Sequence, residues 1–328
     1  MFIDRYGRKI TYLRISVTDR CNIRCVYCMP AEGILQSTHQ AILRYEEIAL
    51  IVRLAAEHGI TEVRLTGGEP LVRADLPDLI RMIAHTPGIE DVSLTTNGLL
   101  LGKMAKELAE AGLRRVNVSL DTLNPERFAR ITRGGSLQKV LDGLDLAEVW
   151  GLLPIKINMV VMRGVNDDEM ESMAQLSVTR GWHVRFIEIM PIQNQTPWGE
   201  GFPMPADTYY PIPEMIERLK EAGLQKVNDK VGSGPAVEYC LPGALGRIGF
   251  ITPVSEPFCS QCNRLRLTAD GNLRPCLMSD IEVPILQTLR EGGDILPLFE
   301  QAVLLKPEAH ELQDQHAPAG RCMRQIGG

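Results

Sequence analysis

The sequence predicts an α/β fold with a parallel sheet, followed by a smaller C-terminal extension. Two observations predict the sheet: short apolar runs alternate with helical patterns from residue 11 to about 222, and the runs are rich in Val, Ile, Leu and Thr. Parallel strands have this composition because both faces of their sheet are covered, and their alternation with helices indicates strand–helix units. A third observation, the loss of this rhythm after residue 223, predicts the extension.

Six runs are expected to form the strands of this sheet. They are Tyr12–Val17, Glu62–Thr66, Asp91–Thr95, Arg115–Leu120, Ile155–Met162 and His183–Met190. Six units are too few for a closed eight-stranded barrel. A doubly wound sheet and an incomplete barrel of the TIM type both fit the pattern.

Helices are expected between these strands. The apolar positions within 48–55 recur at helical spacing, and Gly59 supplies a stop. Asn124 is expected to cap a helix that has Pro125 in its first turn. Asn166 is expected to cap another helix, with acidic residues directly after it.

The chain after residue 223 contains a stretch rich in Gly and Pro and two short strand candidates, Arg247–Thr252 and Leu265–Thr268. We interpret this part as a separate extension packed on the sheet. The polar end is expected from its composition to be a frayed tail. The predicted units are therefore residues 1–222, 223–309 and 310–328.

Composition narrows the class of protein. The 328 residues carry a net charge of −6, whereas a general nucleic-acid binder is usually basic. The segment 1–11 is charged and does not resemble a secretory signal. The most apolar run, 152–162, contains Lys156 and is too short to span a bilayer. We expect a cytoplasmic protein with no nucleic-acid or membrane partner.

Six of the eight cysteines fall in two groups of three. Clustered cysteines in a cytoplasmic chain indicate metal ligands, because disulfides are rare there. Cys240 and Cys322 stand alone and receive no predicted role. Lys306 and His310 are also left without an assigned role.

The first group, Cys21-x3-Cys25-x2-Cys28, follows the first strand directly. A structural zinc site uses four protein ligands, and the nearest histidine along the chain is His39. Three thiolates on a [4Fe–4S] cluster would instead leave one iron open to a small molecule. A zinc loop that borrows a distant ligand is the alternative.

Thr66-Gly67-Gly68-Glu69-Pro70 follows the second strand. Its glycines would let the backbone approach a ligand closely, and Glu69 could accept from an ammonium group. Taken alone, this segment could be any strand-to-helix turn.

Together with the first cysteine group and Tyr27, this segment resembles the radical S-adenosylmethionine superfamily. The resemblance implies a partial (β/α)6 barrel that is open on one side. It also implies a [4Fe–4S] cluster whose open iron binds S-adenosylmethionine, and a 5′-deoxyadenosyl radical that takes a hydrogen atom from the substrate.

The second group is Cys259-x2-Cys262-x13-Cys276, in the extension. A zinc ribbon would place a fourth cysteine where Ser279 stands, so the spacing favours a second [4Fe–4S] cluster with an open iron. The zinc alternative stays open at this point. Its fourth ligand would be Cys240, Cys322 or His310.

Between these cysteines runs Asn263-Arg264-Leu265-Arg266. In a strand, Arg264 and Arg266 share one face. Two guanidinium groups beside an open iron suit an anionic ligand, although a solvated pair of surface arginines gives the same pattern.

The whole combination, with the end Arg321-x-Met323-x-x-Ile326-Gly327-Gly328, resembles the GTP 3′,8-cyclase family of molybdenum cofactor biosynthesis over essentially the full chain. The resemblance implies a lyase with two [4Fe–4S] clusters that converts GTP to 3′,8-cyclo-7,8-dihydro-GTP, for use by cyclic pyranopterin monophosphate synthase. It implies an electron donor such as flavodoxin or ferredoxin, and a monomer or homodimer.

The resemblance also assigns residues. Contacts to S-adenosylmethionine would come from Tyr27, Gly68, Ser119 and Met190. Contacts to GTP would come from Arg14, Arg64, Thr95, Lys156, Arg264, Leu265 and Arg266. The expected catalytic residues are Arg14, Arg264, Arg266, Gly327 and Gly328, with the terminal glycines reaching the active site.

Position in the predicted strands agrees with several of these assignments. Gly68, Thr95, Ser119 and Met190 lie at or just after strand ends, where a parallel barrel carries its chemistry, whereas Lys156 falls early in its strand. No Gly-x4-Gly-Lys-Ser/Thr loop occurs in the sequence. We therefore expect side-chain cations to hold the phosphates, and we do not expect a GTPase.

There are three rival functions. A radical maturase acting on a peptide would also carry an extra cluster, but it does not explain Arg264, Arg266 or the terminal glycines. A zinc-stapled binding module without enzymatic activity is the rival from another class. A radical enzyme that modifies RNA conflicts with the acidic balance.

Overall fold

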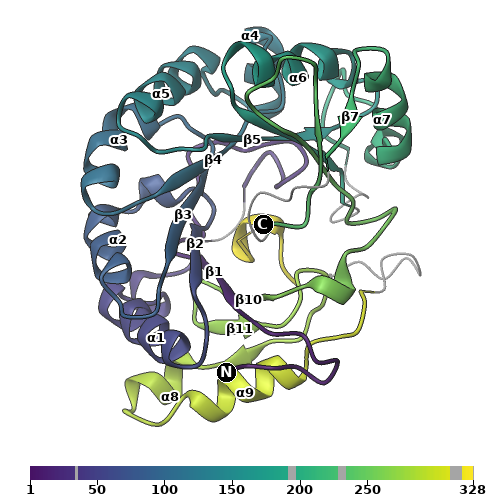
Figure 1. Cartoon of the computed structure of the whole chain (residues 1–328). Helices are drawn as coiled ribbons and strands as arrows, with labels where there is room; N and C mark the ends of the chain where they lie inside the picture. The colour runs from purple at the N-terminus through teal and green to yellow at the C-terminus, as the bar shows by residue number, and fades with distance from the viewer. Residues whose placement is uncertain (34–35, 191–196, 228–233, 311–319, 328) are drawn as a thin grey trace.

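The computed structural model describes residues 1–33, 36–190, 197–227, 234–310 and 320–327. Its strands form one 12-stranded sheet in the order β12-β11-β10-β1-β2-β3-β4-β5-β6-β9-β8-β7. The pairings from β10 through β1 to β6 and on to β9 are all parallel. Figure 1 shows this sheet curving into an open ring with helices around the outside. The fold is the expected α/β partial barrel.

The described elements have the following bounds. The strands are β1 Tyr12–Ser16, β2 Glu62–Thr66, β3 Asp91–Thr96, β4 Arg115–Ser119, β5 Lys156–Val161, β6 His183–Glu188, β7 Gln225–Lys226, β8 Val237–Cys240, β9 Ile248–Ile251, β10 Arg264–Leu267, β11 Asn272–Arg274 and β12 Val283–Pro284. The α-helices are α1 Tyr45–Glu57, α2 Leu76–Ala84, α3 Leu101–Glu110, α4 Pro125–Thr132, α5 Leu137–Val149, α6 Met170–Thr179, α7 Ile212–Lys220, α8 Leu286–Arg290 and α9 Leu296–Leu304.

The six expected strands are confirmed as β1 to β6, and most ends agree to within one or two residues. Asn124 caps α4 as predicted, because its side chain accepts a hydrogen bond from the backbone nitrogen of Arg127 at 2.9 Å. Asn166 stands at the N-cap position of a 3-10 turn, Asp167–Glu169, and acidic residues follow it as predicted, but its side chain does not cap this turn. Its side-chain amide instead donates to the backbone oxygens of Asp121 at 2.7 Å and Val160 at 2.9 Å, which ties the ends of β4 and β5 together.

The chain after residue 222 continues the sheet, whereas we expected a separate unit packed on it. Strand β9 pairs in parallel with β6 and places Phe250 beside Phe186. Strand β10 pairs in parallel with β1 and places Arg266 beside Arg14. An open barrel leaves unpaired strand edges, which proteins cover, and here the extension covers both. Its second cysteine group is thereby carried into the ring.

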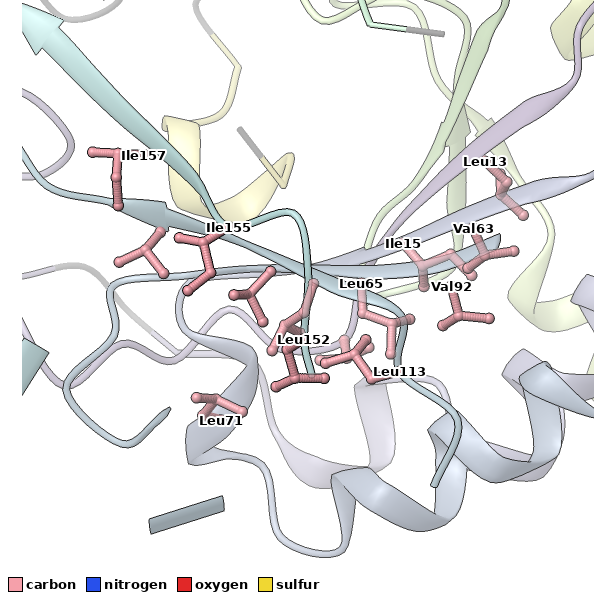
Figure 2. Packing of buried hydrophobic residues seen from close by; sticks show 14 of the residues in the cluster. Leu13, Ile15, Val63, Leu65, Leu71, Val92, Leu113, Leu152, Ile155 and Ile157 are labelled. Atoms are coloured by element: carbon pink, nitrogen blue, oxygen red, sulfur yellow. The ribbon is translucent and has the colours of Figure 1, made fainter. Parts of the chain in front are cut away.

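The main hydrophobic core lies between the outer face of the sheet and the helices. Figure 2 shows Leu13 and Ile15 of β1 beside Val63 and Leu65 of β2, and all four side chains are completely buried. Side chains alternate between the faces of a strand. Because these apolar residues point outward toward the helices, the alternating position Arg14 points into the ring.

The described end of the chain is packed inside the molecule. Residues Met323–Gln325 form a 3-10 turn, and Figure 1 shows the C-terminal end near the middle of the ring. The side chains of Cys322, Arg324 and Ile326 are buried. The frayed tail expected from composition is therefore wrong for residues 320–327, since apolar and arginine contacts hold them.

No helix in the described parts of the chain combines the length and the apolar character that a bilayer span requires.

Candidate active site

One cavity of about 340 Å³ lies inside the ring, and both cysteine groups line it. It also collects almost all of the predicted ligand-binding residues, although they come from strands and loops far apart in the sequence. These residues are Arg14, Tyr27, Arg64, Gly68, Thr95, Ser119, Lys156, Met190, Arg264 and Arg266.

Three predicted site residues do not line this cavity as described. The side chain of Leu265 is completely buried in the main core, so only its backbone could face a ligand. Gly327 is absent from the cavity lining, and its backbone oxygen accepts a hydrogen bond from Nη1 of Arg266 at 2.8 Å. Gly328 lies outside the described residues.

The glycines after β2 bring two loops together. A Cβ atom on Gly67 would lie 2.5 Å from the backbone oxygen of Thr18, and one on Gly68 would lie 2.3 Å from that of Arg20. The backbone nitrogen of Gly68 donates to Thr18 at 2.7 Å. These glycines therefore allow the chain leading into the first cysteine group to pack against the turn after β2.

Glu69 of the same turn is used inside the protein. Its carboxylate accepts hydrogen bonds from the backbone nitrogens of Leu71 at 3.0 Å and Asn97 at 2.7 Å, and from the hydroxyl of Thr96 at 2.7 Å. Burial raises the pKa of Glu69 to about 7. Glu69 does not line the cavity, so these contacts join the turn after β2 to the end of β3, and the contact with an ammonium group stays a prediction.

The first three thiols suit ligands of a cationic metal group. Burial raises the pKa of Cys28 to about 12 and that of Cys25 well above its ordinary value, and neighbouring thiols add to both effects. Such thiols ionise when a metal supplies positive charge. The donor set therefore fits a thiolate-bound iron–sulfur cluster.

Tyr27 contacts Asp121, a residue that we did not predict from the sequence. Its hydroxyl donates to Oδ2 of Asp121 at 2.7 Å, while Oδ1 accepts from the backbone nitrogen of Val160 at 2.9 Å. Burial raises the pKa of Asp121 to about 6. Asp121 lies just after β4, so the rule that identified Ser119 could also have found it.

Three arginines occupy one level of the sheet on three adjacent strands. Arg14 of β1 is in register with Arg64 of β2 and with Arg266 of β10. Burial, followed by repulsion from Arg266, lowers the pKa of Arg14, and the pKa of Arg266 is lowered to about 10. Bringing three cations together in a cavity costs free energy, which a bound anion would offset. The cluster therefore indicates a site for a polyanion.

More cations line the cavity beyond Arg64. Burial, together with the charges of Arg185, Arg115 and Arg64, lowers the pKa of Lys156 to about 7. Lys156 does point into the cavity. We did not predict Arg185 from the sequence. It stands two residues after the start of β6, so strand alternation places it on the same face as His183.

Unsatisfied polar atoms also face this space. Among the described residues, Oγ1 of Thr95 and Oδ1 of Asn158 are buried without a hydrogen-bond partner, and both residues line the cavity. Buried polar atoms normally have partners. These atoms therefore fit contacts to a polar ligand.

The second cysteine group lies among cations. Burial alone would raise the pKa of Cys262, but Lys306 and Arg264 outweigh it, so the pKa is lowered. Arg264 and Arg266 both face the cavity, as the strand alternation predicts, while Leu265 and Leu267 face the core.

The zinc alternative finds no support in the described geometry. No three Cys, His, Asp or Glu side chains there are grouped closely enough to hold a single metal ion. Of the expected fourth ligands, Cys240 lies on β8 and does not line the cavity. Cys322 lies near enough to Cys28 to raise the pKa of that thiol, and His310 lines the cavity.

Comparison with known proteins agrees with this geometry. Residues 15–177 match the model of the radical SAM superfamily, and residues 182–312 match that of Molybdenum Cofactor Synthesis C. The GTP 3′,8-cyclase of Pelotomaculum thermopropionicum is 50% identical over 330 residues, covering 99% of each chain. The GTP 3′,8-cyclase of Moorella thermoacetica is 48% identical over 329 residues, again covering 99% of each chain.

Solved structures show the same fold at low sequence identity. SuiB of Streptococcus suis, bound to its precursor peptide, aligns with a TM-score of 0.62 at 13% identity, covering 90% of this chain and 67% of that one. At that identity the likeness concerns the fold alone and does not favour a peptide maturase. The full-length relatives decide the family, and the chain belongs to the GTP 3′,8-cyclases of the radical SAM superfamily.

Proposed function

We propose that this protein is a lyase that converts GTP to 3′,8-cyclo-7,8-dihydro-GTP, the first step of molybdenum cofactor biosynthesis. The observation that carries the proposal is one cavity lined by both cysteine triads and by three arginines in register. A nucleoside triphosphate offers the polyanion that such a cavity requires, and the two triads place metal groups at its sides.

Cys21, Cys25 and Cys28 would hold the first [4Fe–4S] cluster, which membership of the superfamily implies together with S-adenosylmethionine. When bound, this group supplies the electron that cleaves S-adenosylmethionine. Contacts to the cosubstrate would come from Tyr27, Gly68, Ser119 and Met190, which all line the cavity. The hydrogen bond between Tyr27 and Asp121 would keep the aromatic ring in place against this ligand.

The cationic wall would hold the phosphates of GTP. Arg14, Arg64 and Lys156 lie on three strands that converge on the cavity, and their charges repel one another until an anion arrives. The unpaired hydroxyl of Thr95 adds a neutral polar contact. Arg264 and Arg266 extend the same wall to the second triad.

Cys259, Cys262 and Cys276 would hold a second [4Fe–4S] cluster whose open iron receives guanine. Support comes from the three thiols at the cavity wall and from the cations beside Cys262. Arg264 beside this triad would face the guanine end of the nucleotide. The described tail would close the chamber, because Arg266 holds Gly327.

We also propose a one-electron donor such as flavodoxin or ferredoxin, a cytoplasmic setting that keeps the thiols reduced, and a monomer or homodimer. The synthase that forms cyclic pyranopterin monophosphate would use the product. The units 1–222, 223–309 and 310–328 remain our proposed division of the chain.

A single-turnover reaction with GTP deuterated at C3′ tests the proposed function. We expect deuterium in the recovered 5′-deoxyadenosine, together with a new bond between C3′ and C8 in the product. Recovery of 5′-deoxyadenosine without deuterium would contradict removal of the C3′ hydrogen.

A further inference from the structure

Lys306 follows α9 and is far from the cysteine groups in sequence, yet its side chain is only 4% exposed. Its ammonium group donates to Sγ of Cys262 at 3.3 Å and to the backbone oxygens of Arg264 and Pro275, both at 2.8 Å. An ammonium group carries three protons. These three contacts therefore use its full donor capacity.

The three acceptors belong to the segments that carry the second cysteine group. Cys262 is one of its members, Arg264 begins the strand between the cysteines, and Pro275 directly precedes Cys276. A single buried cation thus links the loop before β10 to the turn after β11.

Arg8 anchors the remaining cysteine. Its Nη1 donates to the backbone oxygen of Cys259 at 2.6 Å and to that of Glu308 at 3.0 Å, and its Nη2 donates to that of Pro307 at 2.6 Å. Pro307 directly follows Lys306 in the chain. Arg8 therefore ties the first cysteine of the group to the segment that carries Lys306.

Asp4 fixes Arg8 in turn. Oδ2 of Asp4 accepts from Nε of Arg8 at 2.6 Å, and the Asp4 side chain of this ion pair is completely buried. Oδ1 accepts from the backbone nitrogens of Tyr6 and Arg8. Removing one partner of a buried pair is costly, so the N-terminal turn has a defined geometry.

We propose that Lys306 is a positioning residue for the second cysteine group and that Arg8 holds the segment carrying it. The inference rests on the proposed second cluster. Donation to Cys262 stabilises the thiolate that a cluster requires, and the carbonyl contacts fix the spacing of the loops around it. Groups of this kind orient metal ligands and tune the metal.

The test uses the full-length protein, reconstituted anaerobically with iron and sulfide. We expect Lys306→Met to lower bound iron about twofold, while the reductive cleavage of S-adenosylmethionine without GTP stays near its normal rate. In the fraction that retains the second cluster, loss of the ammonium donor should make its reduction potential more negative and change its electron paramagnetic resonance signal. Lys220→Met is the matched control, because this exposed lysine pairs only with Glu217 in the described contacts.

Arg8→Lys keeps the charge but loses the guanidinium fork that reaches three backbone oxygens. We expect a smaller loss of iron from the second group than in Lys306→Met. Circular dichroism checks the fold of each variant, and Arg8→Lys decides the matter if Lys306→Met is unfolded. Normal iron content with an unchanged resonance signal in the folded variants would overturn the inference. A wild-type chain that binds only one cluster would instead overturn the proposed second cluster.

Discussion

The two cysteine groups face the same cavity but differ in their surroundings. Around the first, burial and neighbouring thiols raise the pKa of Cys25 and Cys28, and the carboxyl of Asp121 adds to the effect on Cys25. Around the second, Lys306 and Arg264 lower the pKa of Cys262 despite its burial. In the second group, burial still raises the pKa of Cys276. The first group thus lies in a setting that disfavours thiolates, whereas the second has cations beside it that favour the thiolate of Cys262.

This difference teaches how one chamber can serve two ligands. S-adenosylmethionine carries a sulfonium and an ammonium group, and it would meet the less cationic end near Tyr27 and Asp121. GTP is strongly anionic and would meet the end where Arg14 and Arg266 lie in register. Opposite charge preference at the two ends would orient both ligands before any reaction occurs.

The largest expected effect separates the two groups. Cys25→Ser should abolish both the cleavage of S-adenosylmethionine and the conversion of GTP. Cys262→Ser should abolish only the conversion of GTP, because the first group remains intact. Quantifying 5′-deoxyadenosine and the cyclised product by liquid chromatography checks both. Loss of cleavage in a folded Cys262→Ser variant would mean that the two groups do not act separately.

The cationic end can be tested by removing the central arginine. Arg14→Ala should weaken GTP binding about 10- to 100-fold, since a hydrogen bond to a charged group contributes about 1.5–3 kcal/mol. Binding of S-adenosylmethionine should change little, and equilibrium dialysis of each ligand measures the two. Arg218→Ala, which breaks an ion pair with Glu171 away from the cavity lining, is the control. An equal loss of affinity for GTP and for S-adenosylmethionine would refute the idea that the two ends of the cavity prefer ligands of opposite charge.

The described tail, residues 320–327, should affect turnover of GTP because it is closely packed. Gly327 has a φ of +67°, and a Cβ atom there would lie 2.4 Å from Oγ1 of Thr66. Gly327→Ala should therefore displace the tail and lower turnover of GTP roughly tenfold. Gly292→Ala is a matched control, since Gly292 has a φ of +74° with open space around its added Cβ. Equal turnover in the two variants, at equal melting temperature, would argue against a role of the tail in the turnover of GTP.

The smallest expected effect is a dependence on pH. Lys156 has a pKa of about 7 in the free protein, and bound phosphate should raise it. GTP then binds with proton uptake above pH 7, so its affinity should fall as the pH rises from 7 to 8, by about fivefold or less. Titration calorimetry at the two pH values measures this fall. The Lys156→Met variant should lose this dependence on pH. A steep fall in affinity for GTP that persists in the variant would mean that another group titrates.

Much of the architecture could be predicted from local patterns. The strands β1 to β6 follow from apolar runs whose composition suits a covered sheet, and the Asn124 cap follows from its side chain and the proline after it. Arg264 and Arg266 share a face because strand periodicity is local. Asp121 and Arg185 were missed, although the same rules applied to them.

By itself, the sequence determined the parallel sheet, the two cysteine groups and the family, because spacing and alternation are properties of neighbouring residues. Only the tertiary structure decided that β9 and β10 complete the edges of the ring, and that Glu69 bonds within the protein. It also decided that Lys306 and Arg8 reach the second cysteine group from distant positions. Such contacts join segments that no local pattern relates, so they exist only once the sheet has closed around them.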